Sequence, residues 1–231
     1  MNRLLLLLAF YLPLFYSCGT KKQAVKEQKT VFNYNESAGI TSLDPAFARN
    51  VENIWAVNQI FNGLVQMNDK LQVEPCIAKS WEISKDGLKY TFYLRTDVYF
   101  HDHMLFHHGK GRKVVASDFV HSFFRIIDPE VASPGVWLFE HLDKSNDLGV
   151  AAINDSTLQL HLKNPFPPFM GLLTMQYCSV IPHEIVEHYG RDFRNNPIGT
   201  GPFKFKLWKE GVKLIFSKNE KYFEIGDDGE P

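Results

Sequence analysis

The segment 78–125 constrains the fold most, because it passes from a strand pattern to a helix pattern across one long loop. Residues 90–95 read Y-T-F-Y-L-R after an Asp-Gly turn pair, and this aromatic and β-branched composition predicts a strand. Ser117 and Asp118 predict the N-terminal cap of a helix that stops before the Asp-Pro pair at 128–129. The apolar stripe expected on this helix consists of Val120, Phe123, Phe124 and Ile127.

Further elements are predicted on both sides of this segment. Residues 31–34 are a short strand candidate, residues 157–162 alternate as a half-buried strand, and residues 203–208 and 212–216 form a hairpin around Gly211. Two more helices are expected. One runs from 51 to about Gly63 with an amphipathic face, and the other covers 183–188 behind a proline; the face of the first consists of Val51, Ile54, Trp55, Asn58, Phe61 and Val65.

The first 30 residues have the pattern of an export signal. Arg3 precedes a largely apolar run at 4–16 that is too short to span a bilayer, and Ser17-Cys18-Gly19 follows it. We expect residues 1–17 to be a lipoprotein signal peptide, with Cys18 acylated after cleavage; an ordinary signal peptide is the alternative. Residues 18–30 are rich in Lys and Gln and predict a tether outside the fold.

Charge and cysteine content narrow the possible functions. The net charge is −1 and no basic tract stands out, so a nucleic-acid partner is not expected. The 19 phenylalanines suit either a large apolar core or a lined cleft. Export would permit a disulfide between Cys76 and Cys178, but the sequence does not show that they meet, and we treat both as buried thiols.

Several linked motifs resemble one protein family. In order they are S-L-D-P at 42–45, A-K-S-W-E-I-S-K-D-G-L-K-Y-T-F-Y-L-R at 78–95, V-Y-F-H-D at 98–102, V-V-A-S-D-F-V-H-S-F-F-R at 114–125, D-P-E-V-A-S-P at 128–134 and P-I-G-T-G-P-F at 197–203. The chain resembles the extracytoplasmic solute-binding proteins of bacterial ABC importers for peptides and nickel, of the oligopeptide- and dipeptide-binding type. The resemblance implies a protein facing the periplasm or cell exterior, which delivers an oligopeptide or dipeptide to permease subunits. Acylation of Cys18 would anchor it to the membrane by lipid. It implies no enzymatic activity and no cofactor.

The same resemblance implies the architecture. It predicts an α/β fold of mixed sheets with flanking helices, namely a type II periplasmic-binding-protein lobe with an inserted α+β subdomain. Residues 31–61 with 183–231 would form the first subdomain of the N-terminal lobe, and residues 62–182 the insert. Because the chain matches about the first half of a family member, the second lobe is expected to be absent from it, or to be supplied by a partner chain.

The resemblance also places the ligand contacts. It assigns them to the loop 46–50, to the segment 135–137 and to the glycine loop 199–201. Arg49 could pair with a ligand carboxylate or be an ordinary surface arginine. Trp137 could form a cleft wall or pack internally. The predicted ligand-binding residues are Ala46, Phe47, Ala48, Arg49, Asn50, Gly135, Val136, Trp137, Gly199, Thr200 and Gly201.

Two alternatives concern metals. The loop 101–112 carries four imidazoles that could bind nickel, zinc or copper, although a solvated loop is the default interpretation; they belong to His101, His103, His107 and His108. The other alternative is a zinc hydrolase on the 183–188 helix, which reads H-E-I-V-E-H. This falls short of H-E-x-x-H because Glu187 stands where the second histidine would be, so a solvated helix face is expected instead.

Overall fold

The computed structural model describes residues 31–145, 149–226 and 229. Residues 36–231 form one compact unit. Within the described ranges, no helix is both long enough and apolar enough to cross a bilayer. The predicted signal peptide, tether and Cys18 lie outside the described residues.

The main sheet has four antiparallel strands in the order β3-β4-β6-β5. They span β3 Ala78–Ile83, β4 Lys89–Leu94, β6 Thr157–His161 and β5 Val150–Asn154. The strands predicted at 90–95 and 157–162 are therefore confirmed. Leu158 and Leu160 are fully buried while their neighbours are half-buried, which is the alternation that the sequence predicted.

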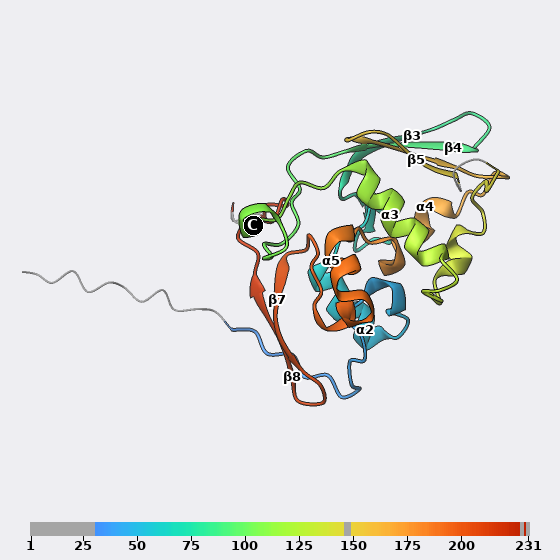
Figure 1. The fold of residues 1–231 in the computed structure, drawn as a ribbon. Coiled ribbons are helices and arrows are strands. Elements are labelled where there is room, and N and C mark those ends of the chain that lie inside the picture. Colours follow the sequence, from blue (N-terminus) through green and yellow to red (C-terminus); the bar gives the residue numbers. More distant parts are fainter. Residues whose placement is uncertain (1–30, 146–148, 227–228, 230–231) are drawn as a thin grey trace, which may run out of the picture. The chain divides into compact units, whose positions relative to one another are not determined.

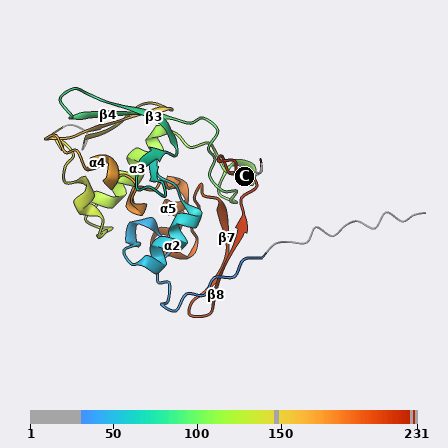
Figure 2. The same ribbon diagram turned by 180° about the vertical axis from the view of Figure 1, so that it is seen from behind.

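Helix α3 (Ala116–Ile127) packs against β5 and β6, beneath the sheet in Figures 1 and 2. The helix is confirmed, and it ends at Asp128 as predicted, but the predicted cap is wrong. Val115 is the cap residue, and Asp118, three residues on, accepts a hydrogen bond from the Val115 backbone N–H at 2.9 Å.

The buried face of α3 also differs from the prediction. The buried apolar side chains follow the spacing i, i+3, i+7, i+10 and are Ala116, Phe119, Phe123 and Ile126. Val120, Phe124 and Ile127 flank this stripe and are half-buried. Besides Ala116, six residues of this helix are aromatic or aliphatic. Two overlapping apolar stripes therefore fit the sequence, and only packing against the sheet selects one of them.

Helix α2 (Val51–Ile60) confirms the predicted helix but exposes part of the predicted face. Val51 is 66% exposed and Trp55 is 51% exposed. The buried face instead includes Asn53, whose side chain accepts a hydrogen bond from the Thr41 backbone N–H at 2.9 Å and donates to the Thr41 hydroxyl at 3.0 Å. Asn53 can be buried because its side chain is hydrogen-bonded on both sides. A pattern of apolar residues cannot predict a buried position of this kind.

Two smaller antiparallel sheets contain the other described strands. One pairs β1 (Val65–Met67) with β2 (Val73–Pro75), and the other pairs β7 (Phe203–Lys209) with β8 (Lys213–Lys218). Gly211 has a φ of 68° in the second hairpin, a conformation that glycine adopts at little cost. The predicted hairpin is confirmed.

The remaining helical segments are short. Helix α4 covers Phe169–Leu172, and α5 covers His183–Tyr189, which confirms the helix predicted at 183–188. Short 3₁₀ segments connect the larger elements; they are η2 Pro45–Phe47, η3 His107–Gly109, η4 Val136–Phe139, η6 Gln176–Cys178 and η7 Gly190–Asn195.

The predicted strand at 31–34 is wrong. No described strand pairs with this segment, and Val31 and Phe32 are 72% and 86% exposed. Its apolar residues had suggested a strand, but without a neighbouring strand the backbone gains no ladder of hydrogen bonds.

One continuous apolar core fills the compact unit, and many of its largest members are phenylalanines. The fully buried ones are Phe92, Phe119, Phe123, Phe139, Phe169 and Phe193. Cys76 and Cys178 belong to the same core as free thiols, which confirms their treatment as buried cysteines.

Candidate functional site

The predicted ligand loops 46–50 and 135–137 lie together in the structure, and Ser133 connects them. The Ser133 hydroxyl donates a 2.6 Å hydrogen bond to the backbone carbonyl of Ala46 and accepts one of 3.1 Å from the Gly135 N–H. Ser133 is only 4% exposed, so both bonds are shielded from water. The motif S-P at 133–134 is therefore a structural link between two loops far apart in the chain.

Segment η6 contacts both of these loops. The Gln176 side chain donates a hydrogen bond to the Ala48 carbonyl, and the Tyr177 ring lies against Gly135. A β-carbon on Gly135 would stand 2.6 Å from that ring, so only glycine lets the two segments approach this closely. Glycine is therefore needed at position 135 so that this segment can pack against Tyr177.

A buried ion pair fixes the start of the first loop to α3. Arg125 donates to both carboxylate oxygens of Asp44, at 2.6 and 3.0 Å, and the two side chains are 11% and 3% exposed. Asp44 also accepts a hydrogen bond from the Ala46 N–H at 2.9 Å, which holds η2 in place. Both residues belong to the family motifs, but nothing in the sequence indicates that these two motifs pair with each other.

The outward side of these loops combines aromatic surface with one cation. Phe47, Val136 and Trp137 are 37%, 43% and 44% exposed, and Arg49, on the same loop as Phe47, is also exposed. No described carboxylate forms an ion pair with Arg49. We call Phe47, Arg49, Val136 and Trp137 the aromatic face. Such a surface can hold an apolar side chain and a carboxylate of one ligand.

Three other predicted residues of these loops differ in accessibility. Ala46 and Ala48 are buried, and their carbonyls are already occupied by Ser133 and Gln176. Asn50 is exposed and precedes α2 without capping it through its side chain.

The third predicted segment, the glycine loop 199–201, lies at the opposite end of α2. Gly201 donates its N–H to the carbonyl of Ile60, the last helix residue, at 2.7 Å. Ten residues of α-helix span about 15 Å, so the structure does not bring this loop to the start of α2. A β-carbon on Gly199 would stand 2.2 Å from the Ile60 oxygen, and Thr200 is 1% exposed. The loop is buried, and its contact with ligand remains a prediction.

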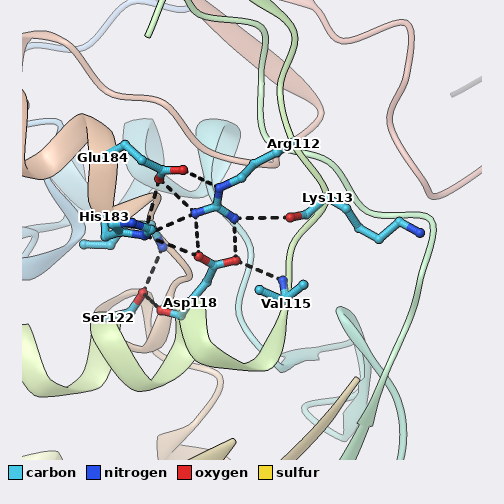
Figure 3. Close-up of polar contacts among 8 residues, drawn as sticks. Arg112, Lys113, Val115, Asp118, Ser122, His183 and Glu184 are labelled. Atoms are coloured by element: carbon cyan, nitrogen blue, oxygen red, sulfur yellow. Dashed lines mark hydrogen bonds and ion pairs between the residues drawn. The ribbon is translucent and has the colours of Figure 1, made fainter. Parts of the chain in front are cut away.

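Arg112 is the centre of a polar cluster that the sequence did not predict (Figure 3). Its guanidinium donates to both oxygens of Asp118, at 2.7 and 2.8 Å, and to both oxygens of Glu184, at 2.5 and 2.8 Å. Asp118 is 2% exposed at the start of α3, whereas Glu184 belongs to α5. The cluster therefore ties the loop after β4 to two helices.

This cluster bears on the hydrolase alternative. The expected solvated face is wrong for Glu184, because Arg112 occupies both of its oxygens. Burial opposes ionisation, but the hydrogen bonds from Arg112 lower the pKa of Glu184 below its usual range. A carboxylate so engaged is a poor general base.

The four histidines of the 101–112 loop do not form a common ligand set. His101 is 4% exposed, which corrects the expectation of a wholly solvated loop, and its Nε2 donates to the Gly201 carbonyl at 2.9 Å. His103 instead contacts Tyr189, and the exposed His107 and His108 rings lie 3.8 Å apart. Among the residues that the structure describes, no group of three or more His, Cys, Asp or Glu side chains could hold a metal ion.

Comparison with known proteins places this geometry in context. The sequence profile described as "Bacterial extracellular solute-binding proteins, family 5 Middle" matches residues 72–231. The chain is 31% identical over 206 residues to the "Probable deoxycholate-binding periplasmic protein YgiS" of Escherichia coli, covering 83% of this chain and 37% of that protein.

Two solved structures are similar to this fold. One is the ABC transporter-associated periplasmic binding protein DppA of Helicobacter pylori in complex with the peptide STSA, with 34% identity and a TM-score of 0.70 over 81% of this chain and 38% of the other. The second is NikZ of Campylobacter jejuni in complex with Ni(L-His), with 32% identity and a TM-score of 0.68 over 82% and 35%. The chain spans a little over a third of the length of these proteins.

Proposed function

The chain belongs to family 5 of the bacterial extracellular solute-binding proteins, and from this membership we propose that it captures peptides outside the cytoplasmic membrane for an ABC importer. The single observation that supports a peptide ligand is the aromatic face, in which the exposed Arg49 and Trp137 belong to two loops that Ser133 joins. Similarity to a transporter-associated protein that holds a peptide supports the same function.

The chemistry of the face suits one end of a peptide. The planar guanidinium of Arg49 can bind a terminal carboxylate through two parallel hydrogen bonds, and Trp137, Val136 and Phe47 offer apolar surface to the last side chain. Contacts to the peptide main chain would account for tolerance of different sequences.

A calorimetric titration of the full chain with a short peptide tests this assignment. Arg49→Gln is expected to weaken the binding of a free-acid peptide about tenfold, since a hydrogen bond to a charged group is lost. The C-terminally amidated peptide should bind wild type and variant alike. Arg191→Gln, which removes another exposed arginine, is the matched control. Equal losses for the acid and the amide would contradict the role of Arg49.

A nickel–histidine chelate is the second candidate ligand, because the chain is similar to NikZ in complex with Ni(L-His). Arg49 could pair with a chelate carboxylate in the same way. Titration with preformed nickel–histidine separates the two candidates: tighter binding than any peptide of two to five residues would favour the chelate.

Anchoring at Cys18 is a further part of the proposal, supported by the small residue before Cys18 at the end of the apolar run. Two acyl chains or more would hold the protein at a bacterial membrane, facing permease subunits. Mass spectrometry of the N-terminal peptide from the native host should find acylated Cys18, and Cys18→Ser should release the protein into the soluble fraction. An unmodified Cys18 in the mature protein would contradict anchoring.

A further inference from the structure

Tyr177 belongs to η6, the segment that contacts both loops of the aromatic face. The residue before it is attached to the first loop, because the Gln176 side chain donates a hydrogen bond to the Ala48 carbonyl. The Tyr177 ring packs on the second loop, against Gly135. Tyr177 is only 5% exposed, so its ring is a fixed part of the support beneath the aromatic face.

The hydroxyl of this ring forms no hydrogen bond within the described part of the chain. It is also not one of the polar atoms that the described fold encloses completely without a partner, which are His101 Nδ1 and His121 Nε2. The Tyr177 oxygen therefore keeps contact with solvent, although most of the ring is buried. A buried ring with an accessible hydroxyl presents one hydrogen-bonding group in a fixed position.

The charge of Arg49 acts on this hydroxyl. Burial raises the pKa of Tyr177, and the guanidinium of Arg49 opposes that rise. The phenol thus keeps its proton at neutral pH and can donate it close to a cation. Because Arg49 follows Ala48 directly, the contact from Gln176 fixes the backbone of both partners. The hydroxyl and the guanidinium are therefore two donors at one place.

Two such donors suit a single carboxylate. A carboxylate has about four acceptor sites, so it can accept two hydrogen bonds from Arg49 and still accept one from Tyr177. A carboxamide at the same place has one oxygen only, and its N–H groups would face the guanidinium, which cannot accept. The pair of donors therefore favours a ligand with a free carboxylate over one in which that group is blocked.

We propose that the Tyr177 hydroxyl is a second specificity-determining group of the peptide site and donates a hydrogen bond to the ligand carboxylate that Arg49 binds. This inference rests on the proposed function, because it concerns the same face and the same end of the peptide. It gives η6 a part in ligand selection, although the predicted contacts included no residue of that segment. The site selects peptides with a free C-terminus.

Calorimetric titration of the full chain with trialanine and with trialanine amide tests this role. Tyr177→Phe removes the hydroxyl and keeps the ring against Gly135. We expect the free acid to bind this variant about tenfold more weakly, the value of one hydrogen bond to a charged group, and the amide to bind it within about twofold of wild type. Tyr93→Phe, the same change in β4 beside Glu82, is the matched control and should bind both peptides as wild type does.

The double variant tests whether the two groups hold the same carboxylate. When Arg49→Gln is already present, Tyr177→Phe should weaken binding of the free acid by clearly less than tenfold, because the carboxylate is no longer fixed beside the hydroxyl. Equal losses with and without Arg49 would contradict a shared carboxylate.

The outcomes separate this inference from the proposed function. If Tyr177→Phe binds the free acid as tightly as wild type while Arg49→Gln binds it more weakly, the role of Tyr177 is overturned and the peptide site stands. If wild type binds neither peptide, the proposed function falls, and this inference with it. Urea unfolding separates a purely structural role, since no described hydrogen bond is lost in Tyr177→Phe and its midpoint should equal that of wild type. A lower midpoint together with equal losses for acid and amide would show that the hydroxyl only supports the fold.

Discussion

At the scale of single residues, the motif glycines and the motif histidine act through backbone contacts. Gly201 approaches the end of α2 so closely that its N–H reaches Ile60, and the Gly201 carbonyl accepts from both His101 and Asn219. These residues are buried, and their partners are main-chain atoms that cannot move away cheaply. Their first role is to hold one loop against a helix end.

Gly201→Ala is expected to destabilise the protein by about 2 kcal/mol, within the range observed for forcing extra methylenes into packed sites. The new β-carbon would stand 2.5 Å from the Ile60 carbonyl carbon and 2.6 Å from the Gln59 oxygen. Gly171→Ala is the matched control, because nothing lies within 4 Å of its added carbon. Urea unfolding of the two variants measures the difference; equal stabilities would contradict the close approach.

The buried His101 predicts a specific acid sensitivity. Its pKa is about 4 when folded and about 6.5 when exposed, so between these values the unfolded chain binds the additional proton. Stability is thus fully present above pH 6.5 and falls as the pH drops toward 4, by about 3 kcal/mol if the whole shift is realised. Urea unfolding at several pH values should show a shallower loss for His101→Gln. Parallel curves for both proteins would contradict this prediction.

At the scale of elements, partly buried arginines hold the helices to the loops. Arg112 joins α3 and α5 through Asp118 and Glu184, and Arg125 joins α3 to η2 through Asp44. Each arginine offers a planar fork that satisfies two carboxylate oxygens at once. The aromatic face depends on the second of these links, since Asp44 begins the loop that carries Phe47 and Arg49.

Arg125→Met should therefore cost about 3 kcal/mol, because it leaves the Asp44 carboxylate buried without its partner. Adding Asp44→Asn should recover part of this loss, since the side chain would no longer be charged while its oxygen could still accept from Ala46. Arg191→Met, at an exposed position, controls for loss of an arginine. A double variant as unstable as the sum of the two single variants would show that the pair is not coupled.

At the scale of the whole molecule, one apolar core extends through residues that we propose to divide between two subdomains, 31–61 with 183–231 and 62–182. Core members such as Ile60 and Phe193 belong to the first part, and Phe123 and Phe169 to the insert. Because the core is shared, we expect the two parts to unfold together, even though the chain enters and leaves the insert only once.

Thiol labelling tests whether the insert opens at the same denaturant concentration at which the tryptophan fluorescence of the whole chain changes, because Cys76 and Cys178 both lie within residues 62–182. Burial raises the pKa of both Cys76 and Cys178 to about 12, and the two thiols are 3% and 0% exposed. In native buffer both should resist alkylation, and in urea both should become reactive at the same denaturant concentration. Earlier labelling of Cys76 than of Cys178 would show that the junction near Asn62 opens by itself, and two thiols that never react would indicate a disulfide.

Local sequence determined the elements. The Y-T-F-Y-L-R run, the alternation at 157–162 and the Gly211 turn each specify structure through short-range preferences, and each element formed where it was predicted. The family motifs, read in order, were likewise enough to indicate the fold and the family.

Only the tertiary structure decided which face each helix buries and which motif residues meet. Asp44 and Arg125 are 81 residues apart, and Ser133 and Ala46 are 87 apart, so no local preference could pair them. The same holds for a surface cavity whose lining comes from residues 99–111 and 204–221. Distant segments become buried and hydrogen-bonded to each other only in the packed chain. The reason is that formation of the core decides which surfaces are removed from water.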